Sequence, residues 1–431
     1  MHTRKTAPYG TWASPISAAW LAAGVLPLAS PRLDGGTAYW QQGLPAEGGR
    51  QTVVGGKPHD VPRQRVPAPY NVRTRVHEYG GGAYLPAGGA LYFSNFTDNL
   101  VYVSEADGNI RALTQDGQQR HADFVLDRLR GRLIAVREDH GMGGEEPVNS
   151  LVALGLDGRQ QLLTSGYDFY AAPRLSPDGR HLAWLCWNHP AMPWNETELW
   201  LADVDSDGAL QRVRKLAGGS GESLCQPVWS PDGVLYVVSD RSGWWNIHRV
   251  AEQVLVPVCP MAAEFGRPQW VFGQSMYGFA SAHEIVASYI EQGEGKLLRL
   301  DLRKGEWQAI ATPYTDFQDI AVGSGCVVVV AASPTQAAQV VHIQLATGEM
   351  TVLARSLAEP PAVEHLSVPQ SLHYPSGEGR SAHAFYYPPQ HAGYQAPAAE
   401  LPPLIVTSHG GPTSMASNSL KLGIQYWTSR G

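Results

Sequence analysis

The residues with the clearest chemical potential stand near the C-terminal end of the chain. The run Leu404-Ile405-Val406-Thr407-Ser408 leads directly into His409-Gly410-Gly411-Pro412. Consecutive glycines leave the backbone without side chains, so that an N–H can point at a developing negative charge on oxygen. We predict that the N–H of Gly411 is such an oxyanion donor and that Gly410 keeps the approach open. We expect His409 to anchor the loop by hydrogen bonding and not to act as a general base.

The surroundings of this motif predict which elements position it. Residues 404–408 are apolar and short, as in a strand buried inside an α/β sheet. Residues 419–429 follow as a predicted helix with Leu420, Ile424 and Trp427 on one face. Strand, His-Gly-Gly, loop and helix is the order around the oxyanion loop of an α/β-hydrolase. The sequence therefore predicts the start of such a domain.

A serine nucleophile does not accompany the motif. α/β-hydrolases carry this serine in G-x-S-x-G, and the chain contains no copy of that pattern. The nearest approach, residues 273–278, has its second glycine one position late. We expect the catalytic domain to be incomplete in these 431 residues, and the chain by itself to have no hydrolytic turnover.

Two further segments could bind a ligand. The pair Glu145-Glu146 lies in the glycine-rich stretch 141–147. Paired carboxylates could hold the α-amino group of a substrate, or they could be two solvated loop charges. The run Gly80-Gly81-Gly82 has no lysine after it and is not a G-x-x-x-x-G-K-[ST] phosphate loop. We interpret it as the entry to a blade of the β-propeller that the repeats below predict, at a place that needs positive φ or close backbone approach.

The middle of the chain repeats itself at a period near fifty residues. Ser176-Pro177-Asp178-Gly179 returns as Ser230-Pro231-Asp232-Gly233, and each copy opens an apolar strand. A second pattern is a hairpin whose turn falls at positions 48–49, 108, 158, 208, near 252, 305 and 348. Repeats of about 40–50 residues made of strands and turns indicate propeller blades. We predict a seven-bladed β-propeller over 28–360, with six or eight blades, or an open solenoid, as alternatives.

The propeller leaves a segment at each end. Residues 1–27 contain a short predicted helix, with Ser14 as its N-cap, Pro15 as its first residue and Gly24 as its stop; the alternative is a signal peptide. Residues 361–431 form the incomplete hydrolase domain, in which strands are expected over 363–372 and 382–389. We expect residues 362–431 to be loosely attached to a propeller that is stable without them.

The composition excludes several classes of partner. The formal net charge is −7 and no run of Lys or Arg occurs, which disfavours nucleic acid and anionic membranes. Four scattered cysteines without a C-x-x-C pair favour a reducing compartment and disfavour a zinc site. We therefore expect a cytoplasmic protein without metal or cofactor. An assembly of identical chains is compatible with the sequence.

The combination of these features resembles the prolyl oligopeptidase family of serine peptidases. The repeats, the His77–Gly82 segment, the 404–412 motif and the following Gln425-Tyr426-Trp427 carry this resemblance. It is nearest to the acylaminoacyl-peptidase and dipeptidyl-aminopeptidase-like members. The resemblance implies a propeller that caps a hydrolase domain and admits short peptides, with the Ser, Asp and His downstream of the oxyanion loop. The dipeptidyl type holds the substrate amine with paired glutamates, which Glu145-Glu146 match only loosely.

Two other interpretations stay open at this stage. A free-standing propeller used for binding would make residues 362–431 dispensable. An esterase or lipase would share the oxyanion loop, although lipases usually cap their sites with helices. Among peptidases, dipeptidyl, acylaminoacyl and internal cleavage are all compatible with the sequence.

Overall fold

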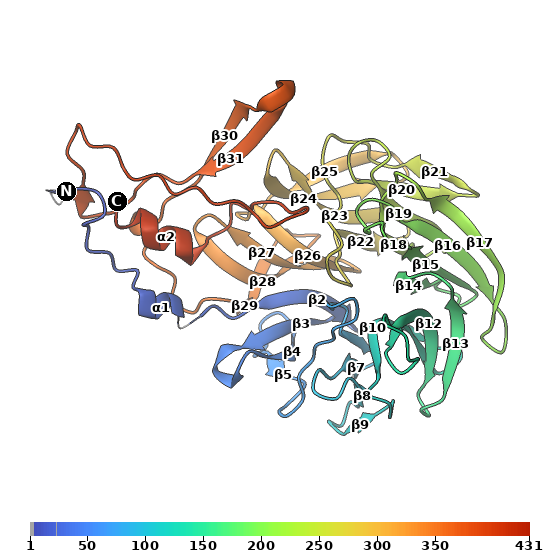
Figure 1. Cartoon of the computed structure of the whole chain (residues 1–431). Helices are drawn as coiled ribbons and strands as arrows, with labels where there is room; N and C mark the ends of the chain where they lie inside the picture. Colours follow the sequence, from blue (N-terminus) through green and yellow to red (C-terminus); the bar gives the residue numbers. More distant parts are fainter. Residues whose placement is uncertain (1–3, 23) are drawn as a thin grey trace.

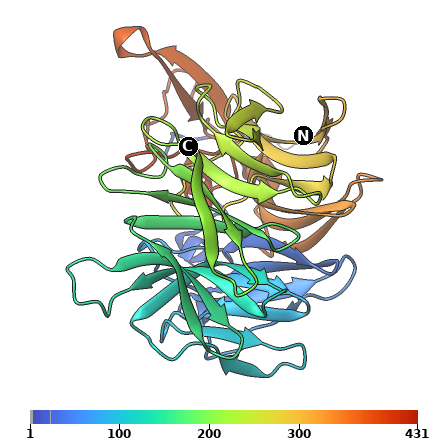
Figure 2. The same cartoon turned by 90° about the vertical axis from the view of Figure 1, so that its right-hand side faces the viewer.

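The alternation of short strands and tight turns folds into a ring of blades. The computed structural model describes residues 4–22 and 24–431, and seven antiparallel sheets of four strands form its main body (Figures 1 and 2). Each sheet is built from four consecutive strands, so the chain completes one blade before it starts the next. The predicted seven-bladed β-propeller is confirmed.

The first strand of each blade contacts the first strand of at least one neighbouring blade and so lies nearest the ring axis. Blade one contains β2 (Leu28–Asp34), β3 (Thr37–Leu44), β4 (Arg50–Gly56) and β5 (Arg63–Gln64); blade two contains β6 (Tyr84–Ala87), β7 (Ala90–Ser94), β8 (Val101–Ser104) and β9 (Ile110–Ala112). Blade three contains β10 (Gln119–Asp127), β11 (Arg132–Asp139), β12 (Val148–Gly155) and β13 (Gln160–Ser165); blade four contains β14 (Phe169–Leu175), β15 (His181–Trp187), β16 (Glu198–Val204) and β17 (Leu210–Gly218). Blade five contains β18 (Leu224–Trp229), β19 (Leu235–Ser239), β20 (Asn246–Ala251) and β21 (Val254–Pro257); blade six contains β22 (Tyr277–Ser281), β23 (Glu284–Glu291), β24 (Glu294–Asp301) and β25 (Glu306–Ile310). Blade seven contains β26 (Asp316–Gly323), β27 (Cys326–Ser333), β28 (Gln336–Gln344) and β29 (Met350–Arg355).

The repeated Ser-Pro-Asp-Gly motif joins the first strand of a blade to the second. In blade four, the Ser176 hydroxyl lies 2.6 Å from Asp178 Oδ1 and accepts the N–H of His181, the first residue of β15. Gly179 takes the left-handed conformation that the turn requires. Ser230 and Asp232 form the same contact before β19. The motif thus closes the turn with its own side chains.

The predicted hairpins are present, with one difference in position. Six of their turns join the third strand of a blade to the fourth, whereas the turn at Gly48-Gly49 joins the second to the third. In the hairpin whose turn falls near residue 252, Glu252 takes a positive φ of 57° in the place that glycine fills in the other hairpins. The spacing of the hairpins therefore gives the number of blades but not the strand order in blade one.

Side-chain packing closes the ring, together with a backbone hydrogen bond from the Leu26 N–H to the Ser356 carbonyl at 2.8 Å, between the segments that flank blades one and seven. Within the described residues, no blade takes a strand from another part of the chain. The first and last blades instead share one apolar cluster, in which Trp40 and Val54 of blade one pack with Val328 and Val340 of blade seven. Burial of apolar surface between blades is consequently the interaction that holds the two ends of the propeller together.

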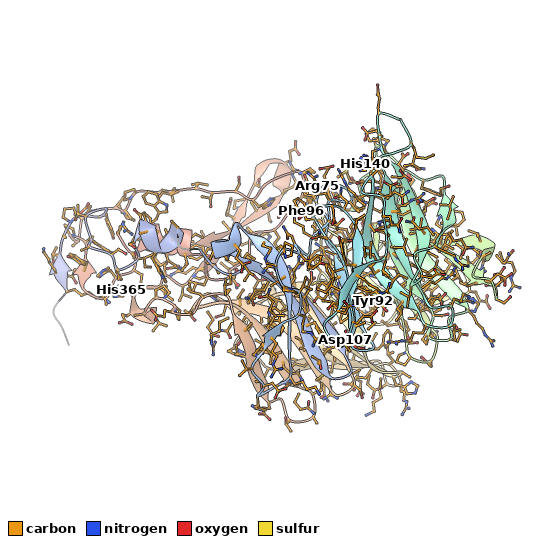
Figure 3. All side chains as sticks on the ribbon, turned by 90° about the horizontal axis from the view of Figure 1, so that it is seen from below. Arg75, Tyr92, Phe96, Asp107, His140 and His365 are labelled. Carbon is orange, nitrogen blue, oxygen red and sulfur yellow. The ribbon has the colours of Figure 1, made fainter. Side chains whose placement is uncertain are left out.

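The two ends of the chain come together outside the ring. Elements here are β1 (Lys5–Thr6), α1 (Ala18–Ala22), β30 (Gln370–Pro375), β31 (Ser381–Tyr386), β32 (Tyr394–Gln395) and α2 (Leu422–Thr428), with short 3-10 turns at Val363–His365 and Gly377–Gly379, while a third 3-10 turn, Pro45–Glu47, lies in blade one. We call residues 4–22 and 361–431 the terminal unit. Strand β1 pairs in parallel with β32, and Trp12 packs on the rings of His391 and Tyr394. The N–H of Gly10 donates to the Arg430 carbonyl at 2.9 Å, which joins the two ends of the chain, and Figure 3 places His365 in this unit, away from the blades.

The prediction of a strand at residues 404–408 is wrong. This segment has no regular structure, and Leu404, Ile405 and Val406 are 78%, 57% and 81% exposed. A strand needs a neighbour to take its N–H and C=O groups, and no strand of the described residues pairs with it. Its apolar composition alone cannot bury it.

The two predicted helices exist but are shorter than expected. Helix α2 buries Leu422 and Gln425, while Trp427 is 57% exposed, so the predicted apolar face is wrong. The Gln425 amide determines this orientation because it bonds both the N–H and the C=O of Ser367. Helix α1 starts after Ser17, whose hydroxyl accepts the N–H of Trp20, and not at the predicted cap Ser14. Residue 23, predicted to lie in α1, is outside the described residues.

We predict that Trp40→Ala opens the junction between blades one and seven. Trp40 is fully buried there, and removal of a buried Trp side chain costs about 3–5 kcal/mol. The midpoint of urea-induced unfolding should fall accordingly. Trp307→Ala is the matched control, because Trp307 in β25 is 43% exposed and should cost about 1 kcal/mol or less. Equal losses for the two variants would contradict this account of ring closure.

Candidate functional site

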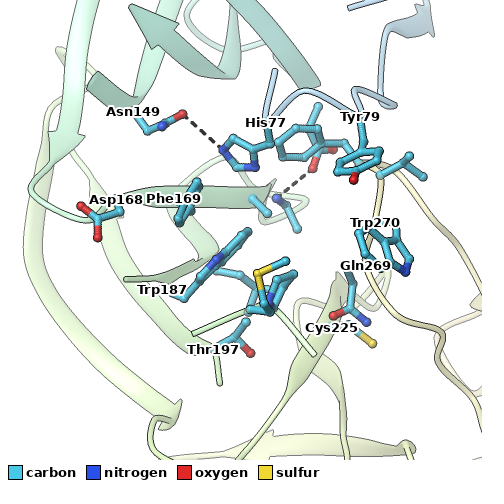
Figure 4. Close-up of a pocket in the computed structure, with 18 of the residues that line it drawn as sticks. His77, Tyr79, Asn149, Asp168, Phe169, Trp187, Thr197, Cys225, Gln269 and Trp270 are labelled. Carbon is cyan, nitrogen blue, oxygen red and sulfur yellow. Dashed lines mark hydrogen bonds between the residues drawn. The ribbon is translucent and has the colours of Figure 1, made fainter. Parts of the chain in front are cut away.

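A cavity of about 1180 Å³ opens among the loops of blades three, four and five (Figure 4). This exceeds the roughly 300–1,000 Å³ of most small-ligand sites. Its walls combine the β5–β6, β11–β12, β13–β14, β15–β16 and β21–β22 connections with residues of strands such as β10, β14, β15 and β18. The cavity has room for a short peptide.

The predicted blade entry at the glycine run follows His77 and Glu78, which line one wall of the cavity. Gly80, Gly81 and Gly82 all have positive φ, and so does His77 just before them. The N–H of Phe272 donates to the Gly80 carbonyl at 2.8 Å, and Gly81 forms an isolated parallel bridge with Phe272. The expectation of close backbone approach is therefore confirmed.

His77 is held in an aromatic setting. Its ring lies 4.7–5.7 Å from the rings of Phe169, Trp187 and Phe272, and its Nε2 is 3.2 Å from Asn149 Oδ1. Burial lowers the pKa of His77 to about 4, although the bond to Asn149 acts in the opposite direction. A neutral, packed imidazole fixes the shape of this wall and is not placed to exchange protons at neutral pH.

Three aromatic side chains form a second wall. The indole rings of Trp194 and Trp270 are 4.3 Å apart, and the Tyr79 ring lies 5.2 Å from Trp270. Tyr79 is 63% exposed although it is large and aromatic. Exposed, converging rings offer a surface for an aromatic or apolar group of a ligand. The sequence analysis did not identify these residues, because no spacing links the three connections that supply them.

Cation–π contacts support the segment that leads to this wall. The guanidinium groups of Arg73 and Arg75 lie 4.6 and 5.1 Å from the centre of the Phe96 ring, and Arg75 and Phe96 are close together in Figure 3. These contacts tie residues 73–75 to blade two. They fix the start of the loop that carries His77 and Tyr79.

Carboxylates outnumber free cations on the cavity lining. Glu145 and Glu146, singled out in the sequence, both line it from the exposed β11–β12 loop. Within the described residues neither side chain has a hydrogen-bond partner or an ion pair. Arg174, by contrast, is paired with Asp123 at 2.9 Å, and Arg267 lies 3.6 Å from Asp316. The unpaired charge facing the cavity is therefore negative, which suits a ligand with an amino group.

A network around Glu138 adds to this acidic side. Its carboxylate accepts the N–H of His77 at 3.1 Å and lies 3.2 Å from Arg120 and 3.0 Å from His140. Glu78, whose side chain is 76% exposed, lies 3.5 Å from the same Arg120. Arg120 thus lies between the carboxylates of Glu78 and Glu138 at the rim of the cavity.

The oxyanion motif lies in the exposed segment before α2. His409, Gly410 and Gly411 are exposed, and a Cβ atom added to either glycine would meet nothing within 4 Å. The His409 ring bonds only within its own loop, to the Gly410 carbonyl at 2.8 Å. Two residues after Gly411, the carbonyl of Thr413 accepts the indole N–H of Trp270 at 3.0 Å. The loop that carries the motif is thus hydrogen-bonded, through Thr413, to the aromatic wall of the cavity. Glu145 and Glu146 lie on a different wall.

The described residues contain no group of three or more His, Cys, Asp or Glu side chains that could hold a metal ion. In the same part of the chain, no helix is long and apolar enough to cross a membrane.

Comparison with known proteins places this arrangement in a family. No protein-family model and no curated protein matches the chain. Among solved structures, a puromycin hydrolase is 37% identical with a TM-score of 0.93, and a Mycobacterium tuberculosis puromycin-hydrolyzing peptidase is 35% identical with the same score. In both cases the alignment covers 99% of this chain and 68% of the other.

A more distant group shares the fold. Prolyl oligopeptidase B from Galerina marginata is 12% identical with a TM-score of 0.64, over 84% of this chain and 55% of that one. Together, the propeller and these neighbours define a peptidase propeller joined to the beginning of a hydrolase domain. The chain belongs to the prolyl oligopeptidase family of serine peptidases.

We predict that Gly81→Ala disrupts the glycine run that follows the wall residues His77 and Glu78. The new Cβ would lie 2.6 Å from the Phe272 nitrogen and closer still to its carbonyl oxygen, at a φ of +90°. Gly108→Ala is a matched control, because Gly108 has a φ of +89° and open space around its Cβ position. The control should cost about 1 kcal/mol of backbone strain, and Gly81→Ala clearly more, in urea-induced unfolding. Equal costs would show that the contact with Phe272 is unimportant.

We also predict a pH dependence that originates at His77. Its folded-state pKa of about 4 lies below the ordinary value of 6.5, so the unfolded chain binds a proton first as the pH falls. The contribution of His77 to the free energy of unfolding is complete above pH 6.5 and decreases toward pH 4, by on the order of 3 kcal/mol.

Stability measured by urea between pH 7 and 4 tests this prediction. His77→Gln should flatten the pH dependence relative to the wild type, and His283→Gln, at an exposed histidine, should not. An unchanged pH dependence in His77→Gln would contradict the assignment.

Proposed function

We propose that this chain is the propeller and oxyanion-loop portion of a serine peptidase that removes amino acids or short peptides from small substrates with a free amino end. The observation that carries the proposal is the bond from Trp270 to Thr413, which joins the His-Gly-Gly loop to the wall of a peptide-sized cavity. In such an enzyme the substrate lies in the cavity while its scissile carbonyl faces the loop.

The chemistry of the lining supports this substrate class. Glu145 and Glu146 supply unpaired negative charge for the amino group, and Tyr79, Trp194 and Trp270 supply an apolar surface for a side chain. The neighbours are described as hydrolysing puromycin, an amide with a free α-amino group and an aromatic side chain. An aromatic residue with a free amine is therefore the preferred substrate end in this proposal.

The reaction would follow the serine-peptidase route. A serine attacks the carbonyl carbon, the leaving amine takes a proton, and water then hydrolyses the acyl-enzyme. The N–H of Gly411 would donate to the oxyanion in both steps, a contribution of about 2.7–4 kcal/mol for one donor. Since no G-x-S-x-G occurs in residues 1–431, this chain alone should be inactive.

The cellular setting and assembly belong to the same proposal. Three of the four cysteines are buried and all are free, and free thiols persist in a reducing compartment such as the cytoplasm. Short peptides are the proposed partners, and neither nucleic acid nor membrane is required. An assembly of identical chains is compatible with this function.

The test compares three forms of one substrate with the full-length protein. Phenylalanine p-nitroanilide should be cleaved, its N-acetylated form should be cleaved far more slowly, and the phenylalanine p-nitrophenyl ester reports general esterase activity. A serine-directed fluorophosphonate should abolish cleavage, and residues 1–431 alone should show none. Ester turnover without amide turnover would favour an esterase, and faster cleavage of the acetylated form would contradict recognition of a free amine.

The paired glutamates provide the variant for that experiment. Glu145→Gln combined with Glu146→Gln should raise KM for the free-amine substrate about tenfold, as expected for loss of a charge-assisted contact. Glu105→Gln, at a partly buried carboxylate of blade two that is absent from the cavity lining, is the control. An unchanged KM would show that Glu145 and Glu146 are solvated loop charges that do not bind the substrate.

A further inference from the structure

We infer that Trp270 is a positioning residue that lets the propeller align the oxyanion loop; this rests on the function proposed above. Trp270 stands in the connection between β21 and β22, so it belongs to the propeller. Its indole N–H donates to the Thr413 carbonyl, which lies two residues after Gly411. A single side chain therefore joins the cavity to the loop that would meet the scissile bond.

The loop has little else to define its position. Between residues 401 and 412 the described structure contains no backbone hydrogen bond to another segment, and the side chains there are largely exposed. The next attachments are at Asn418, whose Oδ1 accepts from Thr315, and at Leu420, whose N–H donates to Ser333. Trp270 thus makes the attachment nearest to Gly411 from outside the loop.

The position of Trp270 is itself well determined. Its ring packs against Trp194 on one side and Tyr79 on another, and both of these line the cavity. A ligand that packs on the three rings would restrict the Trp270 rotamer further and so strengthen the bond to Thr413. Binding in the propeller would in this way favour the aligned loop.

Alignment matters because the oxyanion donor acts only in the transition state. A donor must lie about 2.7–3.1 Å from the developing oxyanion, and a displacement of 1 Å can cost up to about 100-fold in rate. A residue that aligns the donor without touching the substrate carbonyl should therefore change kcat more than KM. This distinguishes positioning from substrate binding.

Trp270→Phe in the full-length protein tests the inference, since it removes the N–H and keeps an aromatic ring. We expect kcat for phenylalanine p-nitroanilide to fall about 3- to 10-fold, as for one neutral hydrogen bond, with KM within about twofold. Trp307→Phe is the control: it also loses an indole N–H, but Trp307 lies in β25 and does not line the cavity. It should leave both kcat and KM within about twofold.

Hydrogen exchange of the loop gives a second readout that does not depend on turnover. Amide exchange over residues 409–413 should accelerate in Trp270→Phe and not in Trp307→Phe, with the thermal midpoint unchanged in both. Unchanged kcat and unchanged exchange in Trp270→Phe would overturn the inference. A wild-type protein with no serine-dependent turnover would instead overturn the proposed function, while the exchange result would still report on the Trp270 contact.

Discussion

Packing between neighbouring blades is the interaction on which the rest of this structure depends. A four-stranded sheet has two faces to bury, and only a closed ring buries both. Every blade here consists of consecutive strands, so the junction of blades one and seven rests on side chains such as Trp40 and Val328. Polar contacts near the axis supplement this packing: Asp123 of blade three accepts the N–H of Ala172 in blade four.

The closed ring explains how loops with little structure of their own form a site. The cavity walls combine residues of five connections with strand residues of blades three, four and five. The Gly80–Gly82 turn fits against Phe272, and the Arg75 side chain packs on Phe96. Binding groups are thus placed by a rigid scaffold, while the oxyanion loop outside the ring is joined to it through Trp270.

Local signals predicted the fold, whereas contacts between distant segments decided the site. The Pro-Asp-Gly turns and regular glycine spacing gave the blades, because turn chemistry depends on adjacent residues. The strand expected at 404–408 failed because strand formation needs a partner elsewhere in the chain. The prediction of the buried face of α2 was wrong because the Gln425 amide bonds to the backbone of Ser367 and turns that side of the helix inward. Glu145-Glu146 could be found as neighbours in sequence, but Tyr79, Trp194 and Trp270 meet only after folding.

In the function proposed for this protein, the propeller cavity and the His-Gly-Gly loop act on one substrate. The most direct measurement is a crystal structure of the full-length protein with a phenylalanine-derived boronic acid bound to its serine. We predict a boronate oxygen about 2.7–3.1 Å from the Gly411 nitrogen, the amino group toward Glu145 and Glu146, and Trp270 bonded to Thr413. A boronate oxygen held only by donors elsewhere, with the inhibitor outside the cavity, would contradict the account.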